Sequence, residues 1–210
     1  MNFKSRLTSS VACLALALAV PTLAHANTIT GTIWYNQCCN TPTFNNLPTS
    51  PADATFTATG LDFEVSSSAN YTVNGFLTSK GDSTGVTTGN GLATLNNTLF
   101  EFTGSAYFVN GQTYKVGHDD GTIMYIGGTS ASNVVLSAPG PTSYSPQSYI
   151  YSGPTGNENF YFLYSENHGA PADFVTNVAD VSAVPEPSTL MMLGTGLLGL
   201  GGVVRRKMGI

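Results

Sequence analysis

The stretch between residues 27 and 184 shows no clear helical hydrophobic period, and this limits most strongly what the chain can fold into. Short runs of β-branched and aromatic residues recur there, separated by Gly, Asn, Ser and Pro, as is typical of strands and turns. Residues 80–91 and 139–146 are expected to be loops. About ten short strands at this spacing predict an all-β fold, an antiparallel β-sandwich. The predicted strands are residues 28–35, 54–59, 61–65, 71–77, 99–103, 106–109, 113–118, 122–126, 133–137, 159–165 and 172–177.

The first 26 residues predict a secretory signal peptide. Lys4 and Arg6 precede an apolar core at residues 11–20, and Ala24-His25-Ala26 has the small-x-small pattern of a cleavage site. A buried core helix would look apolar in the same way, but the basic flank and the cleavage pattern favour export. Cleavage after Ala26 gives a mature chain that starts at residue 27.

The last 26 residues, 185–210, also look like a targeting segment. Pro185-Glu186-Pro187 precedes an uncharged run at residues 190–204, and Arg205-Arg206-Lys207 follows it. Fifteen helical residues span roughly 22 Å, which is short of the ~30 Å hydrocarbon layer of a membrane. A segment that is recognised and then cleaved off is therefore favoured over a permanent membrane anchor. The basic end would stay cytoplasmic, with the preceding chain outside, and residues 180–184 are expected to be a linker.

The order Val184-Pro185-Glu186-Pro187, apolar sorting helix and basic end resembles the PEP-CTERM sorting tail of exopolysaccharide-producing bacteria. The resemblance implies that Pro185, Glu186 and Pro187 form a sorting motif for an exosortase, a membrane peptidase. It also implies export to the cell surface or extracellular matrix, with transient anchoring in the inner membrane. It does not indicate what the exported domain does.

The exported stretch is strongly acidic. It contains two lysines, no arginine and eleven Asp or Glu residues, a net charge of −9 with neutral histidines. This balance argues against nucleic acid as a partner, because phosphate binding needs clustered Lys and Arg. Cations or neutral ligands such as sugars fit better. The expected domain, residues 27–179, is long enough to bury a core without disulfides.

Two cysteines remain once Cys13 leaves with the signal peptide. Cys38 and Cys39 are adjacent, so they can pair with each other, bridge to another chain or stay reduced. The compartment permits oxidation, and the sequence leaves these outcomes open. A metal site built on this pair alone would lack ligands.

Residues 114–128 carry the strongest candidate for a binding site. Two alternating runs flank Asp119-Asp120-Gly121, and Asp-Gly predicts a hairpin. Because consecutive strand side chains point to opposite faces, both carboxylates reach one ligand only through a sharp turn or a strained peptide bond. A Ca²⁺ ion, which takes six to eight oxygens, would hold such an arrangement. The alternatives are a plain hairpin turn, or a transition metal bound by His118 and His168.

Three segments around this motif resemble the protective-antigen-type β-sandwich domain, which is also found in flocculins and bacterial fibro-slime proteins. They are residues 102–108, residues 114–128 and the later segment 160–172. The resemblance implies a β-sandwich and, in its flocculin members, binding of sugars through a bound Ca²⁺.

In those flocculin members, two aspartates joined by a cis peptide hold the Ca²⁺ ion together with an asparagine from a later loop. Carried over by position, the resemblance implies that Asp119, Asp120 and Asn167 are the metal ligands. Glu166, beside Asn167, departs from the family pattern. The residues that would contact a sugar are not indicated.

Three tyrosines lie in a Ser- and Pro-rich stretch, Tyr144, Tyr149 and Tyr151. They are either stacking surfaces for a sugar or rim packing on the sandwich, and rim packing is the favoured interpretation. Trp34 is the only tryptophan, which excludes a binding platform made of several tryptophans.

Signals for catalysis are weak. Residues 81–85 read Gly-Asp-Ser-Thr-Gly but lack the strand–turn–helix setting of a serine nucleophile. Glu101 with Glu158 or Glu166 would form a glycosidase pair only if folding placed the two carboxyls at the right separation. We therefore predict a binding module rather than an enzyme, one that contacts extracellular polysaccharide with the help of Ca²⁺ and supports adhesion or biofilm assembly. A structural matrix protein without a discrete ligand is the alternative, and a glycan hydrolase is less favoured.

Overall fold

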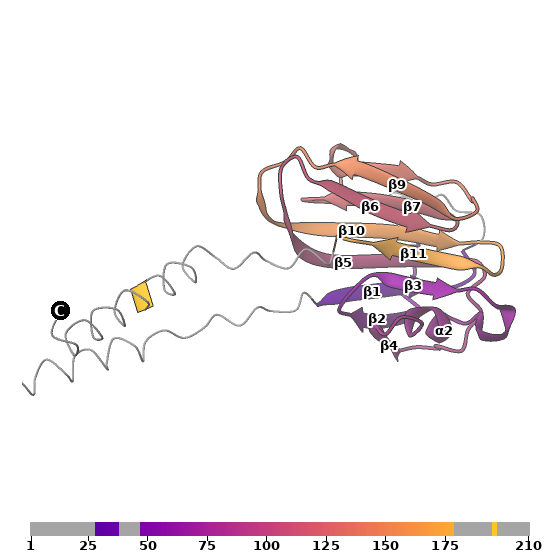
Figure 1. Ribbon diagram of the computed structural model, residues 1–210. Coiled ribbons are helices and arrows are strands. Elements are labelled where there is room, and N and C mark those ends of the chain that lie inside the picture. The colour runs from indigo at the N-terminus through magenta and orange to yellow at the C-terminus, as the bar shows by residue number, and fades with distance from the viewer. Residues whose placement is uncertain (1–27, 38–46, 179–194, 197–210) are drawn as a thin grey trace, which may run out of the picture. The chain divides into compact units, whose positions relative to one another are not determined.

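The computed structural model of the protein describes residues 28–37, 47–178 and 195–196. The described residues between 28 and 178 belong to one compact unit, which contains two antiparallel sheets (Figure 1). The predicted signal peptide and linker, Cys38 and Cys39, and nearly all of the sorting tail lie outside the described residues.

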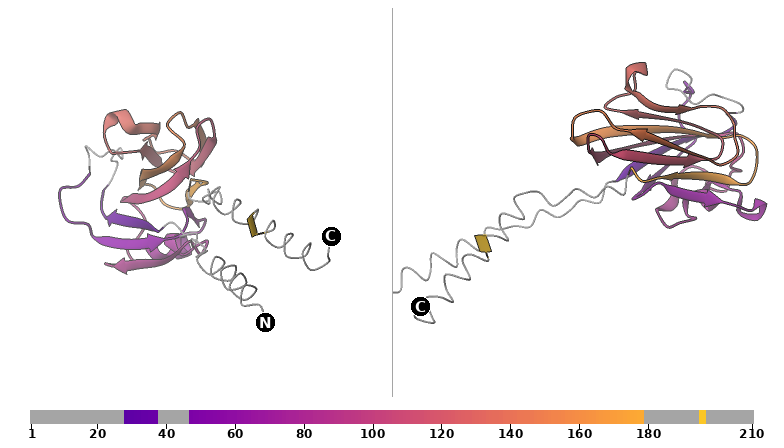
Figure 2. Two further views of the ribbon diagram at one scale, coloured as in Figure 1. Left: turned by 90° about the vertical axis from the view of Figure 1, so that its left-hand side faces the viewer. Right: turned by 45° about the horizontal axis from the view of Figure 1, so that its top comes forward.

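Two sheets packed face to face confirm the predicted antiparallel β-sandwich. The larger sheet has seven strands in the order β4 (Ser83–Thr88), β2 (Ala54–Ala58), β1 (Ile29–Trp34), β5 (Thr98–Phe108), β10 (Gly156–Glu166), β7 (Gly121–Ile126) and β8 (Val134–Ala138). The smaller sheet has four, in the order β3 (Asp62–Val65), β11 (Ala172–Thr176), β6 (Thr113–His118) and β9 (Ser145–Ile150). The short helical elements are η2 (Ser68–Asn70), α2 (Val73–Leu77) and η3 (Ala131–Asn133). Figures 1 and 2 show strands from early and late in the chain side by side, as with β5 and β10.

The core between the sheets is largely aromatic. Phe102 on β5 stacks on Phe174 of β11, with ring centroids 4.9 Å apart, and on Phe63 of β3 at 5.9 Å. Phe102 also lies opposite Phe162 on β10, so inward-facing rings line both central strands. Aromatic side chains bury about 150–250 Å² each, and this burial is the main term that holds the two sheets together.

Residues 71–77, predicted to be a strand, contain the helix α2 (Val73–Leu77). The Thr72 side chain accepts a hydrogen bond from the N–H of Gly75 and caps the helix α2. Val73, Phe76 and Leu77 are all buried, and their i, i+3, i+4 spacing matches one face of a helix. The β-branched and aromatic content therefore misled the prediction, because the burial pattern follows the helical period.

Two further differences concern the predicted loops. Residues 80–91, expected to be a loop, contain β4, which pairs with β2 in an irregular register. Residues 139–146 were also expected to be a loop, but β9 begins at Ser145 and pairs with β6. Both are outer strands, with few buried side chains and weak hydrophobic alternation. Tertiary pairing, rather than local pattern, makes them strands.

The connection between β6 and β7 is not the predicted hairpin. β6 lies in the smaller sheet and β7 in the larger one, and each pairs with other strands. Asp119 and Asp120 alone link them, so this dipeptide is a corner that carries the chain from one sheet to the other. β7 is buried along its whole length, which places it inside the larger sheet rather than beside β6.

Candidate functional site

The Asp119–Asp120 corner is held by backbone hydrogen bonds. Asp119 donates its N–H to the carbonyl of Asp173 at 2.8 Å, which continues the pairing of β6 with β11. Asp120 donates to the carbonyl of Thr142 at 2.9 Å and has φ of 67°, in the left-handed region that Asp tolerates better than most residues. The implied cis peptide is wrong: the bond between the aspartates is trans, and the cis bond of the described residues is Ala170–Pro171. The left-handed Asp120 breaks the strand alternation instead.

His118 supports this turned backbone from inside the protein. Its side chain is buried, and its Nδ1 lies 2.6 Å from the carbonyl oxygen of Asp120. A carbonyl only accepts, so Nδ1 carries the proton and donates it. Burial lowers the pKa of His118, which favours this neutral form. Its other ring nitrogen, Nε2, is buried without a hydrogen-bond partner.

Three buried carboxyl groups meet at the corner. Asp119, Asp120 and Glu166 each place a carboxylate oxygen within 4.8 Å of the others. Glu166 is the last residue of β10, which pairs with β7 inside the larger sheet. The structure therefore brings together two neighbours in sequence and one residue from far along the chain.

Glu166 is the most enclosed of the three. Its Oε1 accepts hydrogen bonds from the hydroxyl of Tyr71 at 2.7 Å and from the N–H of His168 at 3.1 Å. Its Oε2 accepts from the hydroxyl of Tyr164 at 2.9 Å. Burial is the main cause that raises the pKa of Glu166 to about 8, with a smaller contribution from the charge of Asp120. At neutral pH this carboxyl thus tends to hold a proton when no cation is nearby.

Asp119 is shifted in the same direction. Burial first, and then the nearby carboxylates of Asp120 and Asp173, raise the pKa of Asp119 to about 6. Backbone hydrogen bonds with Asp120 and Tyr144 act against this rise. The part of the chain that the structure describes gives these carboxyls no lysine or arginine partner. The group is therefore short of positive charge, which protons or a bound cation would supply.

Asn167 reaches the aspartates through its backbone. Its N–H donates to Oδ2 of Asp120 at 2.6 Å, and its Nδ2 donates to Oγ of Ser165 at 3.4 Å. The sequence did not count Glu166 among the ligands, yet it is Glu166 that joins the two aspartates. Its position offered a signal, because Glu166 continues the inward-facing series that contains Phe162 and Tyr164 on β10.

The two histidines and the remaining glutamates do not form the other predicted sites. Neither histidine belongs to the group of three carboxyls, although Nδ1 of the exposed His168 lies 3.9 Å from Oδ1 of Asp120. Glu101 lies opposite Leu163 on the outer face of the larger sheet, whereas Glu166 points into the core. A substrate cannot lie between carboxyls on opposite faces of one sheet.

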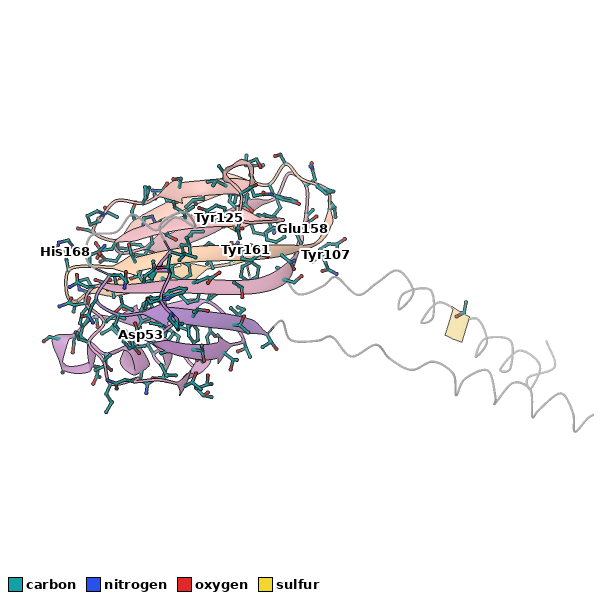
Figure 3. All side chains as sticks on the ribbon, turned by 180° about the vertical axis from the view of Figure 1, so that it is seen from behind. Asp53, Tyr107, Tyr125, Glu158, Tyr161 and His168 are labelled. Atoms are coloured by element: carbon teal, nitrogen blue, oxygen red, sulfur yellow. The ribbon has the colours of Figure 1, made fainter. Side chains whose placement is uncertain are left out.

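An open cavity of about 610 Å³ lies over the aspartates, at the end of the sandwich that Figure 3 marks with His168. Its walls come from the loop before β9 and the loop before β11. Tyr144 contributes a ring that is 51% exposed, and a Cβ at Gly117 would lie 2.4 Å from the Tyr144 hydroxyl. Glycine at position 117 therefore leaves room for this ring. The lining residues are Asp119, Asp120, Pro141, Thr142, Ser143, Tyr144, His168, Gly169, Ala170 and Pro171.

Residues 183–207 match the PEP-CTERM protein-sorting motif. The chain carries a PEP-CTERM sorting signal. The motif marks the protein for export and association with the cell surface, as the sequence predicted. Among the described residues, no helix is long and apolar enough to cross a membrane.

Several solved structures have a similar fold, and two of them are named as PA14 domains. A "PA14 sugar-binding domain from RTX adhesin" is 18% identical, with a TM-score of 0.53, over 71% of this chain and 88% of that one. The PA14 domain of the antifreeze protein MpAFP is 22% identical, with a TM-score of 0.48, over 70% and 78%. The Candida glabrata Epithelial Adhesin 9 A domain, solved with Galb1-4GlcNAc, is 10% identical, with a TM-score of 0.44, over 72% and 81%. A search of curated proteins gave no match. The described domain thus has the fold of a PA14 domain, the protective-antigen type that the sequence resembled.

Proposed function

We propose that the exported domain binds a Ca²⁺ ion at the Asp119–Asp120 corner and uses it to hold a sugar. One observation supports this proposal above all: three buried carboxyls converge within 4.8 Å beside an open cavity. Asp119, Asp120 and Glu166 supply the carboxylate oxygens. Asn167, the ligand that the family resemblance implies, also positions Asp120 through its N–H.

The chemistry of this group fits Ca²⁺. All three side chains offer hard oxygen ligands, which Ca²⁺ prefers, whereas zinc sites in proteins usually include nitrogen or sulfur ligands. The raised pKa values of Asp119 and Glu166 show that the carboxyls are poorly solvated and crowded by like charge. A divalent cation relieves both causes, so we expect binding of the ion to release protons.

The cavity beside the corner fits a hydroxylated ligand. The half-exposed ring of Tyr144 offers an apolar face to the C–H groups of a sugar, and the ion would contact its hydroxyl groups. The sequence favoured rim packing for Tyr144, so this role is assigned from its place at the cavity. The acidic charge of the domain selects against anionic ligands.

The sorting motif sets the cellular context of this activity. We propose that an exosortase-type membrane peptidase recognises Pro185, Glu186 and Pro187 while the tail lies transiently in the inner membrane. The released domain then contacts extracellular polysaccharide at the cell surface or in the matrix, and supports adhesion or biofilm assembly. The resemblance in fold to a sugar-binding PA14 domain supports this proposal.

Isothermal titration of the purified domain with Ca²⁺ tests the metal site. We expect a single binding heat in the unmutated domain and none in Asp120→Asn. Glu101→Gln is the control, because it removes one half-buried carboxylate from the outer face of the larger sheet, away from the corner. The absence of a calcium heat in the unmutated domain would refute the mechanism.

A glycan array probed with and without chelator tests the sugar. Binding that needs Ca²⁺ supports the proposal. A calcium heat without any glycan signal, together with self-association of the domain, would instead favour a structural matrix protein. Release of sugar from matrix polysaccharide would point to a hydrolase.

A further inference from the structure

A second cavity of about 540 Å³ opens between the edges of the two sheets, beside β8 and β9. It lies at the end of the sandwich where Figure 3 places Glu158, opposite the end marked by His168. Its volume falls in the range of small-ligand sites. The lining residues that carry the argument are Ile126, Val134, Tyr149, Ile150, Tyr151 and Glu158.

The strands β7 and β10 each run from one cavity to the other. On β10, Glu166 belongs to the acidic corner and Glu158 to the second cavity, eight residues away. At about 3.3 Å per residue, these two positions are roughly 26 Å apart. Strand β7 likewise begins at the acidic corner with Gly121 and ends at the second cavity with Ile126.

Two polar groups lie at the second cavity, and one of them is buried without a partner. The Tyr149 hydroxyl is buried and makes no hydrogen bond, and among the described residues the one other such side-chain atom is Nε2 of His118 at the acidic corner. By contrast, the hydroxyl of Tyr151 donates to the carbonyl of Pro154. The half-buried side chain of Glu158 lines the same cavity. Folded proteins rarely leave a buried hydroxyl unpaired, so the Tyr149 hydroxyl at this cavity calls for an explanation.

We propose that this cavity is a second binding site, for a neutral sugar unit. Glu158 accepts hydrogen bonds from sugar hydroxyls, and the Tyr149 hydroxyl turns to meet another. Val134 and Ile150 offer apolar walls to the C–H face of the ring, and Ile150 is 67% exposed beside the opening. The Glu158 carboxylate selects against anions, and no metal ligand set is needed, so binding here is independent of Ca²⁺.

Two sugar sites at opposite ends make the domain bivalent. This consequence, unlike the second site itself, rests on the proposed function of the acidic corner. With sites roughly 26 Å apart and facing opposite ends, one domain would join two polysaccharide chains rather than hold one chain twice. The domain is then a cross-linker of the matrix and not only a surface contact.

Saturation-transfer NMR in the presence of EDTA tests the second site alone. The probes are neutral di- and tetrasaccharides of glucose, galactose and mannose. We expect transfer to at least one probe, retained in Asp120→Asn and weakened about tenfold in Tyr149→Phe and in Glu158→Gln, the loss expected for one hydrogen bond. Tyr107→Phe is the matched control, a half-buried tyrosine at the same end but on the outer face of β5 (Figure 3).

No transfer to any probe in EDTA, or transfer that neither cavity variant weakens, would overturn the proposal. Failure of the acidic corner gives a different result, because a missing calcium heat leaves the transfer in EDTA intact. Light scattering with a long-chain form of the best probe tests bivalence. Growth of particles with Ca²⁺ that is lost in both Asp120→Asn and Tyr149→Phe supports cross-linking, and growth unaffected by Tyr149→Phe contradicts it.

Discussion

The two ends of the sandwich are built on the same strands, but their polar side chains have different surroundings. At the acidic end, Glu166 is buried under three hydrogen bonds and beside two more carboxyls, so charge is concentrated without a countercharge. At the other end, Tyr149 and the half-buried Glu158 line an open cavity, and the Tyr149 hydroxyl has no partner among the described residues. The first arrangement favours binding of a cation. The second favours binding of a ligand with hydroxyl groups. This difference shows how one scaffold can support two kinds of recognition.

The pH dependence of stability offers the largest test of the acidic end. Because the folded state raises the pKa of Glu166 to about 8, its stabilising contribution is complete below its ordinary pKa and is lost as pH rises through 8. In EDTA, we expect the free energy of unfolding to fall by about 4 kcal/mol between pH 5 and 9, with Asp119 adding to the fall near pH 6. Urea denaturation at several pH values measures this. Glu166→Gln should flatten most of the slope, whereas Glu64→Gln, a surface carboxylate paired with Lys80, should keep it.

Calcium should restore the free energy of unfolding that is lost at high pH, and it should do so by binding at the acidic end. At a Ca²⁺ concentration 100-fold above Kd, we expect about 2.7 kcal/mol of stabilisation, which raises Tm by about 5–10 °C. Differential scanning calorimetry at pH 7.5 measures the shift. Asp119→Asn should abolish it and Glu158→Gln should not. An equal shift in Asp119→Asn would mean that the ion binds elsewhere.

A pair of tyrosine variants sharpens the description of the second end. Tyr149→Phe removes a buried hydroxyl that has no partner, so it should raise the free energy of unfolding by about 1 kcal/mol when no sugar is present. Tyr114→Phe is the matched variant, since the Tyr114 hydroxyl accepts from the N–H of Val109 at 3.0 Å, and it should lower the stability by about 1 kcal/mol. Urea denaturation compares them. A loss of stability in Tyr149→Phe would show that its hydroxyl is satisfied.

The smallest effect is expected from Tyr144 at the acidic end. Tyr144→Ala removes the exposed ring beside the aspartates and should weaken calcium-dependent glycan binding by about 0.5–1.5 kcal/mol, while the calcium heat is unchanged. Tyr107→Ala is the control at the other end of the sandwich. If Tyr144→Ala removed the calcium heat as well, the ring would be needed for the metal site itself, because alanine keeps the backbone contact with Asp119.

Local pattern was a good guide where one face of a strand is buried. Runs of β-branched and aromatic residues predicted strands along β5 and β10, although the sequence divided β5 into two pieces. It failed at α2, where Val73, Phe76 and Leu77 are strand-forming or apolar residues but are buried with helical spacing. It also failed at the outer strands β4 and β9, which have little to bury and depend on pairing with a neighbour.

The residues of the candidate site also fall into those that the sequence indicated and those that only the fold brought together. The adjacent aspartates stood out because both are acidic within a strand-like run, and family resemblance added Asn167. The third carboxyl, Glu166, became part of the group only because β10 pairs with β7 and ends at the corner. The second cavity had no sequence signal beyond the tyrosines at 149 and 151, since two sheet edges from different parts of the chain form it.

By itself, the sequence determined the strand-rich composition, the acidic charge, the sorting motif and the Asp119-Asp120 pair, because these depend on residues close together in the chain. The tertiary structure decided that this pair is a corner between two sheets with a left-handed Asp120, and that Glu166 and His118 close around it. The physical reason is that sheet pairing joins residues more than forty positions apart, such as Ser165 and Gly121. No local pattern of side chains specifies which strands will become neighbours.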